Sequence, residues 1–277
     1  MSQSIDQSFV RQYEKDVHLA YQRMGSKLRG TVRMKNNING SSTTFQKVGK
    51  GEAVQKTRHG IVTPMNLDHG NVQCILEDWY AGDYIDKLDE LKIQHDERQV
   101  VVDSGAGALG RKTDSMIIDQ LTLTSTSVGD YTTGLTKNLI SQAIEALNDA
   151  DVPDDGQRFG VLASHAWEEF LNIPEVSSAD YVGDQYPWLK GTEARKWRGI
   201  VWQSHSGLPL ANTDDRDCYI YHKTAVGHAV GQEVVSDFDW EGKRVAWFVN
   251  NMMSKGACLI DTLGAVEIRV DDNIALS

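Results

Sequence analysis

The chain has 277 residues and a mass of 30.8 kDa, which corresponds to one large domain or two. Apolar residues make up 40% and charged residues 24%, values that are ordinary for a folded protein and exclude global disorder. The formal net charge of -11 argues against a general nucleic-acid binder, because such proteins need an excess of Lys and Arg. The longest apolar run is five residues, 245–249, against the ~20 of a membrane helix, and no apolar stretch follows Met1. We therefore expect neither a membrane span nor a signal peptide.

The charge is distributed unevenly along the chain. Residues 1–60 contain 11 basic and 4 acidic residues, a net charge of +7, which leaves -18 for the remainder. Three roles for this basic segment stay open: it could bind nucleic acid, associate head to tail with the acidic body of an identical chain, or be a solvated surface without a role. The three cysteines are odd in number and far apart, which predicts reduced, buried thiols.

The N-terminal segment is predicted to form a helix followed by a β-hairpin. Apolar residues at near-helical spacing from Phe9 to Met24 predict an amphipathic helix that ends near Gly25. In residues 36–60 only five of 25 residues are apolar, too few to bury a core. The alternating stretch Thr43–Val48, a turn at residues 49–51 and a return strand at Glu52–Thr57 predict the hairpin. An isolated hairpin is only marginally stable, so its basic side chains favour an acidic supporting surface.

The central part predicts two helices. Val72–Leu76 is typical of a strand, and Asp83 is expected to cap a helix that contains Ile85, Leu88 and Leu91. From Asp96 to Leu121 no proline occurs and apolar residues recur every three or four positions, which predicts a helix of about seven turns. Three glycines inside this helix, at positions 105, 107 and 110, indicate close packing.

The rest of the chain predicts an α/β module followed by strands. Thr136–Asn148 and His165–Leu171 have the spacing of helices, and residues 174–199 are typical of a loop. Strands are expected at Leu121–Val128, Phe159–Ala163, Ile200–Ser204, Cys218–Tyr221, Val245–Asn250, Ala257–Ile260 and Val266–Val270.

One motif suggests an enzyme. The glycines from Gly105 to Gly110 follow three valines and match G-x-G-x-x-G, so an NAD-dependent oxidoreductase is an alternative function. A long helix explains more of the surrounding residues. The eight histidines form no metal-binding motif, and no residues stand out as catalytic, so we expect no enzyme activity, no cofactor and no metal.

Several segments are similar to those of a known family. Three segments resemble the major capsid proteins of tailed bacteriophages: residues 44–51 (TFQKVGKG), 83–91 (DYIDKLDEL) and 108–114 (ALGRKTD). Further similar positions are the turn at 153–156 with Val161-Leu162 and Trp167, and residues 199–201 with Leu208-Pro209. The resemblance implies an α+β fold, the Johnson-type capsid fold. Its parts would be an N-terminal arm (1–30), an extended β-hairpin loop with its return strand (31–80), a peripheral domain with a long spine helix (81–128), an axial α/β domain (129–228) and peripheral-domain strands (229–277).

The function that the resemblance implies is that of a coat protein. Such a chain self-assembles in the host cytoplasm into the hexamers and pentamers of an icosahedral head, and it is found in the virion. Its partners would be other copies of itself, a separate scaffolding protein, a portal protein, a decoration protein and packaged double-stranded DNA, without a membrane. The extended loop would reach over the adjacent subunit. The expected subunit-interface residues are Phe45, Lys47, Lys50, Lys56 and Arg58 in the hairpin and Trp188, Lys190 and Arg195 in a basic loop. A bacterial nanocompartment shell of the same fold is the alternative.

Overall fold

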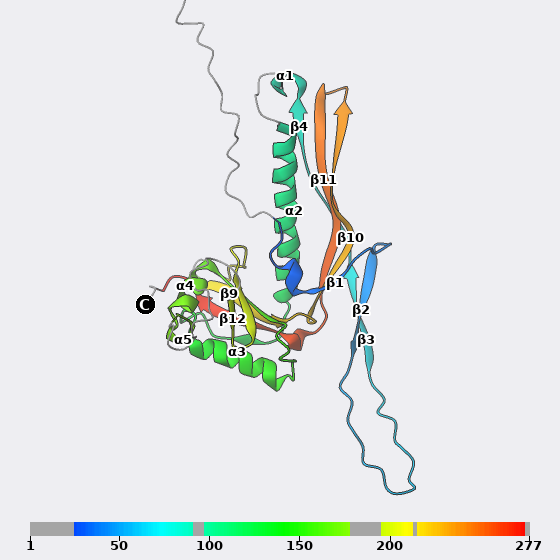
Figure 1. Cartoon of the computed structure of the whole chain (residues 1–277), viewed down its shortest axis with the longest axis vertical. Helices are drawn as coiled ribbons and strands as arrows, with labels where there is room; N and C mark the ends of the chain where they lie inside the picture. Colours follow the sequence, from blue (N-terminus) through cyan, green and yellow to red (C-terminus); the bar gives the residue numbers. More distant parts are fainter. Residues whose placement is uncertain (1–24, 91–96, 178–194, 213–214, 275–277) are drawn as a thin grey trace, which may run out of the picture. The chain divides into compact units, whose positions relative to one another are not determined.

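The computed structural model describes residues 25–90, 97–177, 195–212 and 215–274, and Figure 1 shows it coloured along the sequence. It divides into two compact units. Unit 1 contains Asp78–Lys112 and Gln232–Ser254 together with Met1–Gly25, of which only Gly25 is described. Unit 2 contains Ser26–Glu77, Thr113–Gly231 and Lys255–Ser277. The expected segment 129–228 lies inside unit 2, whereas each of the other four expected segments is divided between the units. The boundaries of the five expected segments stay a prediction.

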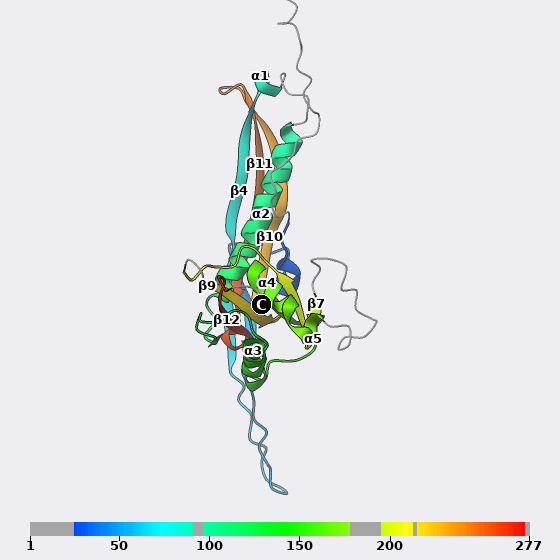
Figure 2. The ribbon, with the colours of Figure 1, turned by 90° about the vertical axis from the view of Figure 1, so that its left-hand side faces the viewer.

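Unit 1 is built from a long helix and a sheet. Helix α2 (Glu97–Leu121) confirms the predicted helix of about seven turns, and it lies along strands β4 (Glu77–Asp86) and β11 (Ala246–Leu259) in Figures 1 and 2. Strands β10 (Val226–Glu241), β11 and β4 are neighbours in a sheet of order β1-β10-β11-β4. Strand β1 (Arg33–Lys35) belongs to unit 2 and pairs with residues 227–229, the part of β10 that lies in the same unit. The short helix α1 covers Lys87–Glu90.

Glycine in α2 allows the helix to pack closely against the sheet, as the sequence predicted. A Cβ atom on Gly105 would lie 2.1 Å from the Nδ2 atom of Asn251. Asn251 is fully buried, donates to the carbonyl of Ala81 at 3.1 Å and accepts from the hydroxyl of Ser236. One buried amide on β11 therefore joins β4 and β10 beneath the helix, and a larger residue than glycine would displace it.

Two expectations for unit 1 are wrong. Asp83 does not cap a helix but lies inside β4, because residues 79–85 alternate between two faces of the sheet. On one face Tyr84 stacks on Phe248 of β11, with ring centroids 4.7 Å apart, while Ile85 on the other face is buried. The 16-residue strand β10 was not expected, and the strands expected at Val245–Asn250 and Ala257–Ile260 are one continuous strand, β11.

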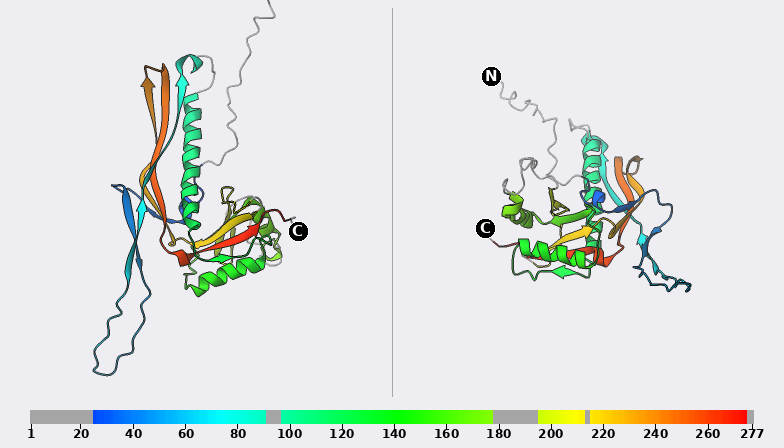
Figure 3. Two further views of the ribbon diagram at one scale, coloured as in Figure 1. Left: turned by 180° about the vertical axis from the view of Figure 1, so that it is seen from behind. Right: turned by 60° about the horizontal axis from the view of Figure 1, so that its bottom comes forward.

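Unit 2 contains a mixed six-stranded sheet of order β5-β12-β9-β6-β8-β7. Its strands are β5 (Ser127–Val128), β6 (Arg158–Leu162), β7 (Arg195–Trp197), β8 (Ile200–Ser204), β9 (Asp215–His222) and β12 (Ala265–Asp271). The helices are α3 (Lys137–Asp149), α4 (Ser164–Asn172) and α5 (Pro174–Ser177), with short 3₁₀ turns at η2 (Arg29–Thr31) and η3 (Thr262–Gly264). Helix α3 lies along the sheet in Figure 3 and contacts β12.

Sequence periodicity accounts for most of unit 2. The side chain of Thr136 accepts a hydrogen bond from the amide of Leu139 and so caps α3, whose residues Leu139, Ile140, Ala143 and Leu147 are buried as expected. The strands at 158–162, 200–204 and 265–271 and helix α4 are confirmed within about two residues. The strand expected at Leu121–Val128 is wrong except for its last two residues, because α2 continues through Leu121. The N-terminal helix expected before Gly25 lies outside the described residues.

Candidate functional site

The extended hairpin is the most distinctive part of unit 2. Strand β2 (Ser42–Val48) pairs antiparallel with β3 (His69–Ile75) over seven residues, and residues 49–68 form a long loop between them (Figure 1). The expected turn at residues 49–51 and return strand at Glu52–Thr57 are therefore wrong. Strand β2 pairs with β3 rather than with residues 52–57. In β3 the alternate residues Val72 and Cys74 face the inside of the protein and are partly or fully buried.

The base of the hairpin is anchored in its own unit. Phe45 is only 2% exposed and packs with Cys74, Ala229, Cys258 and Ile260 in a small apolar cluster, which we call the root cluster. The Phe45 ring lies against Gly227, where a Cβ atom would be 2.8 Å from the ring. Phe45 was expected at a subunit interface. Its burial argues against that role, which stays a prediction, and assigns it to the attachment of the hairpin.

A second glycine holds strand β3 against β11. A Cβ atom on Gly256 would lie 2.0 Å from the carbonyl oxygen of Ile75, so the two backbones touch there. We expect Gly256→Ala to separate the root of the hairpin from β11 and to raise the amide hydrogen-exchange rates of β3 about tenfold or more. Gly70→Ala is the matched control in β3, because its Cβ atom would meet only the carbonyl oxygen of Lys47 at 3.9 Å. Unchanged exchange in Gly256→Ala would contradict the contact.

Two of the four basic hairpin residues contact acids of the same chain. The Nζ atom of Lys47 lies 2.9 Å from the carboxylate of Asp261. Lys50 lies 2.5 Å from the carboxylate of Asp151 and donates to the carbonyl of Ala150, so its charge is placed at the C-terminal end of α3. The hydrogen bond from Lys50 and its charge hold the pKa of Asp151 below its ordinary value. The expected acidic support is thus found within the chain itself for these two residues, and their place at a subunit interface stays a prediction.

The loop itself carries exposed basic and apolar side chains. Lys56 and Arg58 are exposed and have no ion-pair partner among the described residues. Ile61 is 94% exposed and Val62 is 68% exposed, and further exposed apolar residues of the loop are Val54, Met65 and Leu67. Sequence reasoning identified the basic residues of this segment but missed its apolar ones. The signal that could have revealed them is the pair Ile61-Val62 between Gly60 and Pro64, in a segment with no strand periodicity.

The second group of expected interface residues is only partly visible. Trp188 and Lys190 lie outside the described residues. Arg195 begins β7, where its backbone stands opposite Trp202 of β8. The expected contacts of these three residues with a neighbouring subunit stay a prediction.

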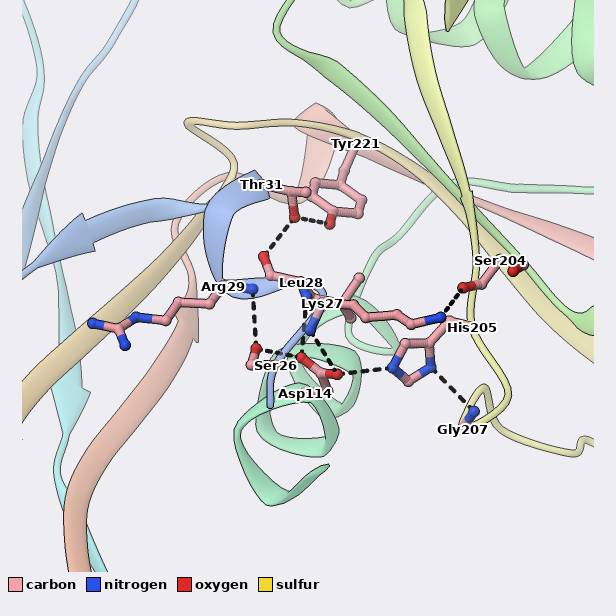
Figure 4. Close-up of polar contacts among 10 residues, drawn as sticks. All are labelled: Ser26, Lys27, Leu28, Arg29, Thr31, Asp114, Ser204, His205, Gly207 and Tyr221. Atoms are coloured by element: carbon pink, nitrogen blue, oxygen red, sulfur yellow. Dashed lines mark hydrogen bonds and ion pairs between the residues drawn. The ribbon is translucent and has the colours of Figure 1, made fainter. Parts of the chain in front are cut away.

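The start of unit 2 is fixed by a buried carboxylate, shown in Figure 4. Asp114 of α2 is fully buried and accepts hydrogen bonds from the hydroxyl of Ser26, from the amides of Lys27 and Leu28 at 3.1 Å each, and from the ring of His205 at 3.1 Å. We call these five residues the N-terminal clamp. Sequence reasoning did not find it, because its members are distant in sequence and belong to no motif.

The hydrogen bonds of the N-terminal clamp define which ring nitrogen of His205 carries the proton and show that Asp114 is ionised. The amide of Gly207 donates to Nδ1 of His205 at 3.1 Å, so the ring proton must lie on Nε2, where it is donated to Asp114. Burial alone would raise the pKa of Asp114, but the hydrogen bonds from His205, Ser26, Leu28 and Lys27 outweigh it and hold the pKa below its ordinary value. An ionised Asp114 therefore fixes the backbone of residues 27 and 28 to α2.

The structural basis of the nucleotide-binding alternative is not present. Val100–Gly110 is continuous helix, without the strand and tight turn that the dinucleotide motif requires. The residues that the structure describes contain no group of three or more His, Cys, Asp or Glu side chains placed to hold a metal. Within the described ranges, none of the helices has the length and apolar character needed to cross a bilayer.

Comparison with known proteins agrees with this architecture. The family model described as "Phage capsid protein" matches residues 5–272. The chain belongs to this family of phage capsid proteins. Its role as a capsid protein, and its place in the virion, follow from that membership. No curated protein sequence matches the chain.

Solved structures share the capsid fold at low sequence identity. The capsid of the cyanophage P-SCSP1u has a TM-score of 0.75 and 16% identity, covering 99% of this chain and 96% of that one. Mycobacterium phage Che8 has a TM-score of 0.73 and 17% identity, covering 94% and 97%. The head of the Helicobacter pylori bacteriophage KHP40 has a TM-score of 0.74 and 10% identity, covering 96% of both chains. These matches confirm the α+β capsid fold implied by the resemblance.

Proposed function

We propose that this chain is the major coat protein of a tailed-phage head and that it assembles into the hexamers and pentamers of an icosahedral shell around double-stranded DNA. The observation that carries the proposal is the extended hairpin, whose loop exposes Ile61 and Val62 to solvent. Clustered exposed apolar side chains mark interaction sites. A second copy of the chain would cover them, and the repetition of this contact would close the shell.

The partner surface that fits this loop lies in unit 1. Its strands carry exposed aromatic side chains, Tyr80 and Tyr84 on β4 and Phe238 and Trp240 on β10. The same strands carry exposed acids, namely Asp78, Asp83, Asp86, Glu233, Asp237 and Asp239. Lys56 and Arg58 would meet acids, and Ile61 and Val62 would meet aromatic rings. We propose that the loop of one subunit lies on unit 1 of its neighbour.

The direct test is the state of the purified protein, alone and with the scaffolding protein of the same genome. Size-exclusion chromatography and electron microscopy should show capsomers and closed shells of uniform diameter. A chain that remains monomeric at every concentration, with and without the scaffolding protein, would contradict the proposal.

The proposal also includes the other partners of the shell and the expectation that the chain is not an enzyme. A scaffolding protein, a portal protein and a decoration protein would bind the shell, which would be assembled in the host cytoplasm. The DNA inside would be bound without sequence specificity, and the net charge of -11 is compatible with this because small cations screen packaged DNA. The chain would have no catalytic function. The alternative, a nanocompartment shell, predicts a neighbouring gene for a cargo enzyme in place of portal and terminase genes.

A further inference from the structure

Two of the three cysteines lie together although 184 positions separate them. Cys74 on β3 is fully buried and Cys258 on β11 is 5% exposed, and both belong to the root cluster. Each of the two cysteines is a neighbour that shifts the pKa of the other. The third cysteine, Cys218, is buried in β9, where it accepts a hydrogen bond from the amide of Ala163. All three are free thiols.

The backbone around the pair brings the two sulfur atoms into reach of each other. Gly256 and Cys258 are two residues apart on β11, so they face the same side of the strand. A Cβ atom on Gly256 would lie 3.4 Å from the Sγ atom of Cys74, in addition to its contact with the backbone of Ile75. No side chain separates β3 from β11 here. A disulfide between Cys74 and Cys258 would therefore join two strands, β3 and β11, whose backbones are already in contact.

The two thiols differ in acidity. The hydrogen bond from Cys258 and the amide of Ala229 outweigh the effect of burial and lower the pKa of Cys74. The hydrogen bond to Cys74 and burial raise the pKa of Cys258. Cys74 is thus the group that ionises first and reacts first, since the thiolate is the nucleophile.

We propose that Cys74 and Cys258 form a redox site at which a hydroperoxide converts the two thiols into a disulfide that locks the extended hairpin onto β11. In the first step the Cys74 thiolate attacks a peroxide oxygen, the O–O bond breaks, and the leaving hydroxide or alkoxide takes up a proton. In the second step the Cys258 thiol loses its proton, its sulfur displaces the sulfenic oxygen of Cys74, and water leaves. Two sulfurs are oxidised and one peroxide is reduced.

Burial controls the rate of this reaction. The oxidant reaches the sulfurs only when the root of the hairpin opens, so oxidation should be slower than that of an exposed cysteine. Once formed, the disulfide prevents this opening. A particle that leaves a reducing cytoplasm for an oxidising medium would meet such oxidants.

The test uses the full chain, reduced, purified and then treated with hydrogen peroxide. We expect two of the three thiols to be lost, a mass lower by two hydrogen atoms, and a proteolytic peptide that joins Cys74 to Cys258. Cys218→Ser is the matched control and should form the same peptide, whereas Cys74→Ser and Cys258→Ser should not. No loss of thiols, oxidation of all three, or disulfides between chains in place of the internal one would overturn the proposal.

A second measurement tests the consequence for the hairpin. Hydrogen exchange of the β3 amides should slow about tenfold or more in the oxidised chain and return to its original rate after reduction. Oxidation that leaves the exchange of β3 unchanged would refute the lock. Both measurements are made on the unassembled chain, so their failure is separate from a failure of the proposed shell function.

Discussion

Replacing Ile61 and Val62 together with aspartate is expected to abolish shell assembly while the free energy of unfolding of the chain stays unchanged. Both side chains are largely exposed, so the folded chain gains little from them. Covering each one at a subunit contact would contribute about 1.5 to 3 kcal/mol, and every subunit of a shell repeats the contact. Two buried aspartates would instead lose hydration without a partner. Electron microscopy of the variant and its urea denaturation curve measure the two effects.

The matched control exchanges the same two side chains conservatively. Ile61→Val combined with Val62→Ile keeps the apolar area and should form normal shells. Lys56→Glu with Arg58→Glu tests the charges of the loop separately and should slow assembly, most clearly at low ionic strength. Lys47 and Lys50 are unsuitable for this purpose, because their reversal would also break contacts with Asp261 and Asp151. Normal shells from the aspartate variant would show that the loop is not covered by a neighbour.

Replacing Asp114 with alanine is expected to lower the free energy of unfolding by about 3 to 5 kcal/mol. The change leaves the amide of Leu28 and the ring of His205 buried without their acceptor. Unfolding in urea, followed by circular dichroism, measures the loss. Asp119→Ala on the same helix is the control and should change stability by less than about 1 kcal/mol, because Asp119 is exposed. Equal stabilities of the two variants would contradict the importance of the clamp.

The clamp also predicts how stability depends on pH. The folded-state pKa of Asp114 lies below its unfolded value, which is about 3.9 for a free Asp side chain. Its contribution is therefore fully present above about pH 4 and is lost as the pH falls through the folded-state pKa, because unfolding then takes up a proton. Denaturation curves at a series of pH values below 5 should fall less steeply for Asp114→Asn than for the natural chain. An identical dependence would mean that Asp114 is not ionised in the folded state.

The spacing of apolar residues along the sequence predicted those helices and strands whose residues favour the same structure locally. The helix at 137–149 buries one face, and the helix at 97–121 has no proline and an apolar residue every three or four positions, so the sequence pattern was sufficient for both. Strand β10 was missed because it contains Gly227 and Gly231 and several acids, which are typical of turns and loops. Position 227 favours glycine because the ring of Phe45 occupies the space that a Cβ atom would fill. That reason comes from tertiary packing and cannot be read from neighbouring residues.

The candidate site was predicted in its position but not in its detail. The low apolar content and basic charge of residues 36–60 correctly placed a hairpin there, yet the partner strand begins at His69, 17 residues after the expected start at Glu52. Local turn signals at Gly49 and Gly51 favour an early return, whereas the pairing of β2 with β3 depends on the root cluster that both strands share with β11. The N-terminal clamp joins residues 26–28, 114 and 205, and no sequence spacing relates such distant positions.

The loop between β2 and β3 also gives the chain a built-in reporter of its own assembly. Its backbone from residue 50 to residue 67 lies outside any strand ladder, and it contains three bonds that trypsin can cleave, after Lys50, Lys56 and Arg58. Free subunits should be cut there early, into two fragments of predictable mass. Subunits whose loop is covered should survive, so the uncut fraction in a timed digestion would measure the occupancy of the contact without a label.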